Sequence, residues 1–455
     1  MNYIKEAYYL GPLVVTSFLL VFTRPFVGLS ILGYRLGELF IVFAFLISIL
    51  SSFYFFFKRG STNYLHIKNI QIIFSLILFT LYLSTFINST GLLSSYTYKI
   101  SSYVWTIGYL FLILYFFQNN SVINKYRKII LLVFLLIPIV HYYFSTGFYP
   151  NFVIDFFILH SDKFEFTKAS DIMLSYVVAN ILNLKLNKNY TFNLYYLYLT
   201  GALLLPLLLF MSRGSFIAAF LFIVMFSFYN FSFFKSNIKK TIKIFIVTFI
   251  VFMFSTYNVN ETEINYSFNF VGPENLANDT LSLSDNIKEI AKKDQQRKAF
   301  LSLYFDNGRL YSHDPTTDWR LDIWQDVVED MNNKSLIMKG YGYNEIIPVM
   351  LDPSAPGRLG RDGLNEHVHN YFVNIFARGG IFQFLLFLFF YLSILLLWKK
   401  KYENYTVLIY ILPILLNSAL DMSMEGVQYP LVFYLILGYL INDGLEVRLK
   451  KLNNT

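Results

Sequence analysis

Two arginines stand in sequence contexts that suit binding of a phosphate group. Arg213 lies in Ser-Arg-Gly-Ser, residues 212–215, between two strongly apolar runs. Arg320 lies in Asp-Trp-Arg-Leu-Asp-Ile-Trp, residues 318–324, where an amphipathic pattern begins. A guanidinium group grips phosphate oxygens through two parallel hydrogen bonds, which an ammonium group cannot do. A permanent charge beside hydrocarbon is also costly and by default indicates a functional site.

Two further segments could turn the backbone sharply or move a proton. Gly340 and Gly342 flank one tyrosine, and such a pair lets a chain turn tightly or approach a ligand. The segment Glu-His-Val-His-Asn occupies residues 366–370. Histidine is the usual general base for removing a proton from a hydroxyl. His367 and His369 could instead ligate zinc from an extended strand, but no third strong ligand accompanies them.

Each of these segments also has a simpler structural explanation. Arg213 could snorkel to lipid headgroups. Arg320 could bind a diphosphate while oriented by Asp318 or Asp322, or it could form an ordinary surface ion pair with them. The glycine pair could be a plain turn, and the histidines could be structural at a helix entry, where Asn370 could cap the helix.

The composition identifies lipid as the main solvent of this chain. Hydrophobic residues make up 56% of the 455 residues and charged residues only 15%, whereas a soluble domain is nearer half apolar and a quarter charged. The formal charge of +8 does not indicate nucleic-acid binding, because the basic residues form short clusters between apolar runs. There is no cysteine, which excludes disulfides and thiolate metal sites.

About twelve apolar runs approach the length of about 20 residues that a transmembrane helix needs. The sixth is short and polar, and the seventh and eighth are separated only by residues 212–214. The predicted spans are 8–23, 37–57, 69–88, 101–118, 128–145, 169–184, 192–212, 214–234, 240–257, 371–398, 404–420 and 427–442. The fold class is therefore an all-α integral membrane protein.

The distribution of lysine and arginine gives the orientation. With both termini in the cytoplasm, about 19 basic residues fall on the inner side and about 6 on the short outer connections, as the positive-inside rule requires. The predicted domains are transmembrane helices 1–9 over residues 1–257, a large outer loop over 258–370, and helices 10–12 over 371–455. Within the loop the sequence predicts helices from Ser284 to about Tyr304 and from Asp318 to about Met331.

In order and placement these segments resemble the O-antigen ligase and O-antigen polymerase superfamily of membrane glycosyltransferases. Members show Ser-Arg-Gly after an apolar helix, then a large periplasmic loop with Arg-Leu-x-x-Trp, Gly-x-Gly and a closing His-Asn, followed by a glycine about ten residues later. The likeness covers roughly residues 200–395. The motifs stand at residues 212–214, 320–324, 340–342, 369–370 and 380.

The resemblance implies an enzyme of the bacterial inner membrane that uses an undecaprenyl-diphosphate-linked glycan donor. Arg213 and Arg320 would hold the diphosphate leaving group, and His369 would deprotonate or orient the acceptor hydroxyl. No metal ion or other cofactor is implied, because the donor is already activated. The residues expected to support the site are Gly340, Gly342, His367 and Asn370.

The resemblance leaves the acceptor open. A polymerase would extend a second lipid-linked repeat unit and could work with a chain-length regulator, whereas a ligase would transfer the glycan to lipid A-core or to protein. The divergent sequence, rich in Phe and Tyr, favours a polymerase. A lipid-linked glycan flippase would share the twelve spans, but such transporters usually show related halves and do not need an outer loop of this length.

Overall fold

Every predicted apolar run forms a helix in the computed structural model, which describes residues 2–57, 67–87, 94–117, 120–261, 302–355, 358–359 and 366–443. The helices of these runs are α1 (Asn2–Val27), α2 (Leu36–Phe57), α3 (Lys68–Ile87), α5 (Ser102–Trp105) with α6 (Gly108–Phe116), α7 (Asn120–Ser145), α9 (Ala169–Leu186), α10 (Tyr190–Met211), α11 (Arg213–Tyr229), α13 (Ile238–Glu261), α16 (Tyr371–Tyr402), α17 (Leu408–Ala419) and α18 (Gln428–Asp443).

Seven helices in the described part of the chain are long and apolar enough to cross a membrane: α1, α2, α3, α7, α10, α13 and α16. The paired helices α5 and α6, together with α11, α17 and α18, are shorter apolar helices at four other predicted spans. The α9 helix has 18 residues and carries Asp171 in its first turn. The chain is therefore a multi-pass membrane protein, and the number twelve stays a prediction.

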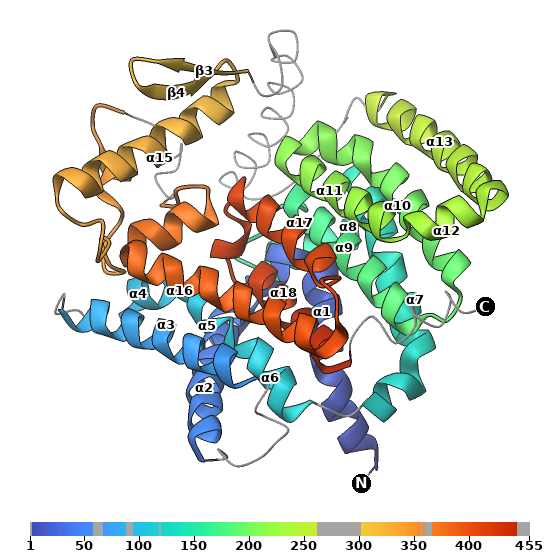
Figure 1. The fold of residues 1–455 in the computed structure, drawn as a ribbon, viewed down its shortest axis with the longest axis horizontal. Helices are drawn as coiled ribbons and strands as arrows, with labels where there is room; N and C mark the ends of the chain where they lie inside the picture. Colours follow the sequence, from blue (N-terminus) through green and yellow to red (C-terminus); the bar gives the residue numbers. More distant parts are fainter. Residues whose placement is uncertain are drawn as a thin grey trace.

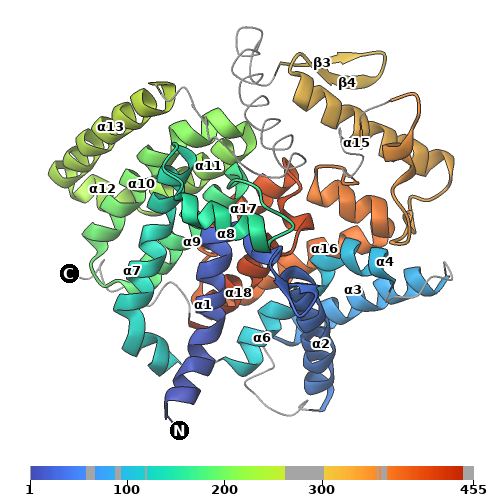
Figure 2. The same ribbon diagram turned by 180° about the vertical axis from the view of Figure 1, so that it is seen from behind.

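The ribbon views place α9 and α18 inside the molecule, with the longer apolar helices around them (Figures 1 and 2). Nearly all residues of α9 are buried, which explains how a helix with a carboxylate and two asparagines can lie among apolar ones. Its polar groups face protein rather than lipid, where an unpaired polar group would cost several kcal/mol, on the order of 4–8.

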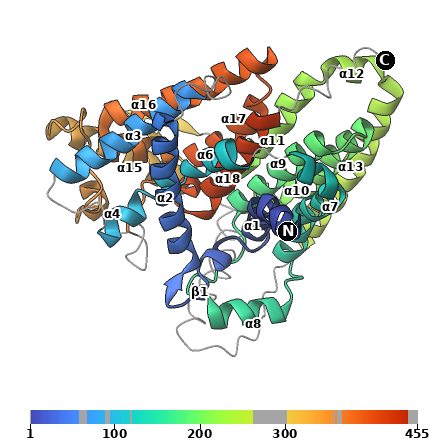
Figure 3. The ribbon, with the colours of Figure 1, turned by 90° about the horizontal axis from the view of Figure 1, so that it is seen from below.

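Connections that were predicted to lie outside gather at one edge of the helix bundle. Figure 3 shows the first strand β1 (Ser30–Ile31), the short helix α4 (Ser95–Ile100) and α8 (Asn151–His160) toward one edge, whereas α12 (Phe231–Ser236) lies toward the opposite edge. Lys235 lies in the last turn of α12 and belongs to a predicted inner cluster. The predicted inner and outer connections shown here thus lie at different edges, and the orientation in the membrane stays a prediction.

The described part of the predicted outer loop begins with a β-hairpin. Strands β3 (Leu303–Asp306) and β4 (Arg309–Ser312) pair in antiparallel register. Asn307 and Gly308 form the turn with φ values of 47° and 80°, which is the two-residue turn that Asn-Gly favours. The predicted helix 284–304 is therefore wrong for its last residues, and the rest of it lies outside the described residues.

Helix α15 (Pro315–Asn333) confirms the predicted helix in the loop. Its buried face consists of Ile323, Val327 and Met331, which are spaced four residues apart and pack with Ile347. The next residue after Val327, Val328, lies off this face and is 48% exposed. A small apolar core thus joins α15 to the start of α16, separately from the main core of the bundle.

We expect the hairpin and the α9–α10 connection to lie on opposite sides of the membrane, as the charge distribution indicates. The absence of native cysteine allows a direct test with the single variants Phe305→Cys and Lys188→Cys, both at exposed positions. A membrane-impermeant maleimide should label Phe305→Cys in intact spheroplasts and Lys188→Cys only after lysis. Labelling of both before lysis would contradict the predicted topology.

Candidate functional site

Arg213 lies at a sharp break between two membrane helices. Ser212 has an extended backbone, ends α10 and caps α11, where its Oγ accepts a hydrogen bond from the amide of Ser215 at 3.5 Å. Arg213 is then the first residue of α11. A methyl group added at Gly214 would lie 3.0 Å from Cβ of Leu420. The glycine therefore lets the start of α11 approach the end of α17 closely.

Asp314 links the start of α11 to the start of α15 in the loop. Its carboxylate accepts hydrogen bonds from the amide of Thr317 at 3.1 Å and from the Thr317 hydroxyl at 2.6 Å, so it caps the N-terminus of α15. The same carboxylate lies 3.4 Å from Nη1 of Arg213. A carboxylate is favoured at a helix N-terminus, and here it also brings the starts of α11 and α15 together.

The side chain of Arg320, in the second turn of α15, extends to the same region between the start of α11 and the end of α17. Its Nη1 donates a hydrogen bond to the backbone oxygen of Leu420, the residue that packs against Gly214. Burial lowers the pKa of Arg320, while the carboxylates of Asp421 and Asp314 raise it. Arginine stays protonated even so, and the site therefore contains two positive charges held close to Asp314.

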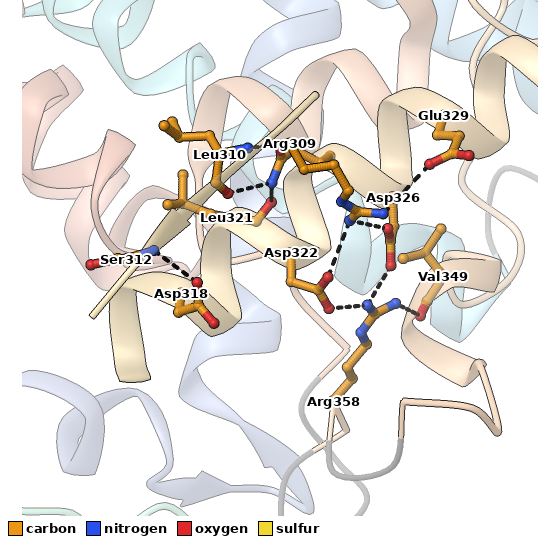
Figure 4. Close-up of polar contacts among 11 residues, drawn as sticks. Arg309, Leu310, Ser312, Asp318, Leu321, Asp322, Asp326, Glu329, Val349 and Arg358 are labelled. Carbon is orange, nitrogen blue, oxygen red and sulfur yellow. Dashed lines mark hydrogen bonds and ion pairs between the residues drawn. The ribbon is translucent and has the colours of Figure 1, made fainter. Parts of the chain in front are cut away.

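The expectation that Asp318 or Asp322 orients Arg320 is wrong. The Asp318 carboxylate accepts a hydrogen bond from the amide of Ser312 at 2.8 Å. Asp322 pairs with Arg309 at 3.1 Å and with Arg358 (Figure 4). Both carboxylates project from other faces of α15 than Arg320 does.

The ion cluster around Arg358 fastens the loop to α15. Arg358 is 3% exposed and pairs with both Asp322 and Asp326, and it donates to the backbone oxygen of Val349 at 3.0 Å. Arg309 from the hairpin joins the same two carboxylates (Figure 4). Glu329 adds a third carboxylate 3.6 Å from Arg309 (Figure 4), so both arginines are compensated within the cluster, and we regard it as support for the site rather than as part of it.

His369 lies at the entrance to α16 beside Arg320. Its φ of 55° is in the left-handed region, and its ring meets Trp319 edge-on with centroids 5.0 Å apart. Burial and the charge of Arg320 lower the pKa of His369 to about 4, although Asp421 opposes this shift. The next residue, Asn370, caps α16 through the amides of residues 372 and 373, as the sequence predicted.

His367 has different surroundings from His369. Its Nδ1 lies 2.5 Å from Oε2 of Glu425, which belongs to the short helix η3 (Ser423–Glu425) between α17 and α18. Between the two histidines, the backbone oxygen of Val368 accepts a hydrogen bond from Nε1 of Trp324 at 2.7 Å. The left-handed conformation of His369 separates the two rings, so they do not share one set of partners.

Metal binding by the two histidines was one alternative for this segment. Among the described residues, no group of three or more histidine or carboxylate side chains converges as a metal site would require. The pairing of His367 with Glu425 and the packing of His369 on Trp319 give each ring its own partner. That the reaction needs no metal stays a prediction.

Gly340 and Gly342 hold the loop against a kink in α16. Both have positive φ, and so has Gly380, where α16 bends. The amide of Tyr341 donates to the oxygen of Ala377 at 2.8 Å, and the amide of Gly342 donates to the oxygen of residue 378 at 2.9 Å. The two glycines therefore allow the backbone of residues 340–342 to pack closely against α16. These residues support the site structurally.

The sequence motifs did not reveal the partners of the site residues. Asp314 precedes the Arg-Leu-x-x-Trp motif by six residues, and Asp421 and Glu425 follow the last motif by more than forty. Asp421 and Glu425 are noticeable as carboxylates near the end of an apolar run. Nothing in one sequence, however, pairs them with Arg320, His369 or His367.

Residues 198–388 match the family model described as O-antigen ligase. This match confirms the predicted resemblance to the O-antigen ligase and polymerase superfamily and supports, at a coarse level, an enzyme of the glycosyltransferase type. The matched segment runs from α10 into α16, so it includes Arg213, Arg320 and His369, whereas Asp421 and Glu425 follow it. A search of curated proteins found no match to this chain.

We expect Gly380→Ala to destabilise the site. The position has φ 68°, and an added methyl group would overlap the backbone oxygen of Met338. The left-handed backbone alone costs about 1–3 kcal/mol for a residue with a side chain, so the melting temperature of the detergent-solubilised protein should fall. Gly11→Ala is the matched control, because nothing lies within 4 Å of the added methyl group there. Equal melting temperatures for the two variants would contradict this account.

Proposed function

We propose that this chain, whose residues 198–388 carry the O-antigen ligase domain, polymerises undecaprenyl-diphosphate-linked oligosaccharide repeat units on the outer face of the inner membrane. The observation that carries the proposal is the convergence of Arg213 and Arg320 at Asp314 and Leu420. The two residues are more than a hundred positions apart, and each comes from a different motif of the family.

A lipid diphosphate is anionic and anchored at the membrane surface, so its binding site needs cations beside the ends of membrane helices. Arg213 begins α11, and Arg320 projects from α15 toward the end of α17. Two guanidinium groups can each take two phosphate oxygens. They would stabilise the negative charge that develops on the departing diphosphate, as a metal ion does in many enzymes of group transfer.

His369 is placed to contact the reacting groups beside this anion site. Its buried ring is neutral at ordinary pH because burial and Arg320 lower its pKa to about 4. A neutral imidazole next to a guanidinium can hold a sugar hydroxyl without adding a further positive charge. Displacement of the diphosphate by that hydroxyl in one step would invert the configuration of the anomeric carbon.

We expect Arg213→Ala and Arg320→Ala each to abolish glycan transfer while the protein inserts at normal levels. Arg213→Lys and Arg320→Lys should restore activity only in part, because a point charge lacks the planar fork that matches diphosphate oxygens. The measurement is the glycan ladder from a complemented deletion strain, read beside the amount of protein in the membrane.

Arg35→Ala provides the matched control for loss of an ion-paired arginine. Arg35 is half exposed, lies in strand β2 (Tyr34–Arg35) and pairs with Asp162 and Glu38, away from the two motifs. A full ladder from either Arg213→Ala or Arg320→Ala would remove that arginine from the donor site. A single modified lipid A-core band in place of a ladder would identify the reaction as ligation.

A further inference from the structure

Three aromatic rings stack at the surface of the β3–β4 hairpin, and none of the sequence motifs includes them. The ring of Tyr304 stacks with the rings of Tyr311 and His313. The ring centroids are 5.6 Å apart for Tyr304 and Tyr311 and 4.7 Å apart for Tyr304 and His313, with interplanar angles of 22° and 24°. Tyr304 is 42% exposed, and His313 is also exposed. We call these three residues the aromatic stack.

The exposed rings of the hairpin are not explained by contact with lipid. The hairpin lies in the predicted outer loop and belongs to none of the predicted spans. All three apolar residues of β3, Leu303 to Phe305, are exposed. Neighbouring exposed apolar side chains outside the membrane indicate a surface that binds a ligand or a partner.

Contacts with α15 hold the hairpin in place. Figure 1 shows it lying alongside this helix. The amide of Leu310 donates a hydrogen bond to Oε1 of Gln325 at 2.7 Å, and Nε2 of Gln325 donates one to the Leu310 oxygen at 2.8 Å. The amide of Ser312 donates to Asp318 at 2.8 Å. The helix that carries Arg320 therefore also positions the rings, as a preorganised binding site requires.

The aromatic stack lies directly beside the two arginines. His313 precedes Asp314, and the Asp314 carboxylate lies 3.4 Å from Nη1 of Arg213. Consecutive Cα atoms are about 3.8 Å apart, so the aromatic stack begins one residue away from the contact between the loop and α11. A glycan whose diphosphate is bound at Arg213 would have its first sugars within reach of these rings.

The chemistry of the aromatic stack suits a sugar ring. A sugar has apolar faces of C–H groups and a rim of hydroxyls, and a tyrosine likewise combines a flat apolar body with a polar hydroxyl. Among the described residues, none forms a hydrogen bond with the phenol oxygen of Tyr304 or Tyr311. The phenols can therefore bind sugar hydroxyls, whereas an acyl chain would leave them unmatched.

We propose that the aromatic stack binds a sugar ring of the lipid-linked glycan whose diphosphate is held by Arg213 and Arg320. The inference rests on the proposed function and adds a saccharide subsite to it. No bond forms or breaks at the rings, so their contact with the glycan is equally strong in the bound substrate and in the transition state. Loss of such a contact raises KM and leaves kcat nearly unchanged.

The kinetic test uses the purified full chain and the lipid-linked repeat unit extracted from a strain that lacks this protein. Tyr304→Leu keeps an apolar side chain but removes the ring. It should raise KM by about 2–10-fold, the range expected for one aromatic contact, with kcat nearly unchanged. Tyr304→Phe keeps the ring and should stay close to the wild-type KM.

Phe305→Ala is the matched control. Phe305 is 73% exposed on the same strand, and successive side chains of a strand point to opposite faces, so its ring lies away from Tyr304. The KM of this variant should equal that of the wild type. A rise in KM as large as that of Tyr304→Leu would contradict the assignment to the aromatic stack.

A binding measurement separates this proposal from the proposed function. The probe is the repeat-unit oligosaccharide released from its lipid diphosphate, and saturation-transfer NMR reports its contact with the protein. The wild type and Arg320→Ala should bind it equally, because Arg320 is assigned to the diphosphate, and Tyr304→Leu should bind it more weakly.

Two results would overturn the saccharide subsite. One is a wild-type KM and wild-type oligosaccharide binding in Tyr304→Leu. The other is an altered oligomeric mass of Tyr304→Leu in detergent with oligosaccharide binding unchanged, which would assign the rings to a contact between copies of the chain. Failure of the wild-type protein to lengthen the lipid-linked glycan, with binding at Tyr304 intact, would instead overturn the proposed function.

Discussion

The contact between Arg213 and Asp314 determines where the loop sits on the membrane helices. Asp314 caps α15 and Arg213 begins α11, so their 3.4 Å ion pair joins two helix starts that are a hundred residues apart. The two side chains are 24% and 14% exposed, so each keeps part of its hydration and either can lose its partner without leaving a fully buried charge. A diphosphate that binds Arg213 would compete with Asp314 for the guanidinium group. Ligand binding and docking of the loop would therefore be coupled at this contact.

The backbone of α16 supplies the second constraint. The helix is entered through His369 in a left-handed conformation and bends at Gly380. The Gly340–Gly342 turn packs into this bend through backbone hydrogen bonds to Ala377 and the residue that follows it. Left-handed residues with side chains carry strain of about 1–3 kcal/mol and persist only where neighbouring contacts hold them. At His369 the cap by Asn370 and the packing on Trp319 provide such contacts. With this backbone conformation the His369 ring lies against Trp319 of α15.

The sequence predicted the features that depend on local pattern. Each apolar run became a helix, the Asp318–Met331 pattern became α15, and Asn370 became a cap. The β3–β4 hairpin was missed even though Asn307-Gly308 is a strong local signal for it. Partners brought together by tertiary folding, such as Asp314 for Arg213 and Glu425 for His367, have no signature in one sequence, since no fixed spacing relates them.

The two histidines show how position within one short segment separates chemical roles. They are two residues apart, yet one faces a guanidinium group and the other a buried carboxylate. A neutral ring beside Arg320 suits contact with an anionic donor, because it adds no charge that would have to be compensated.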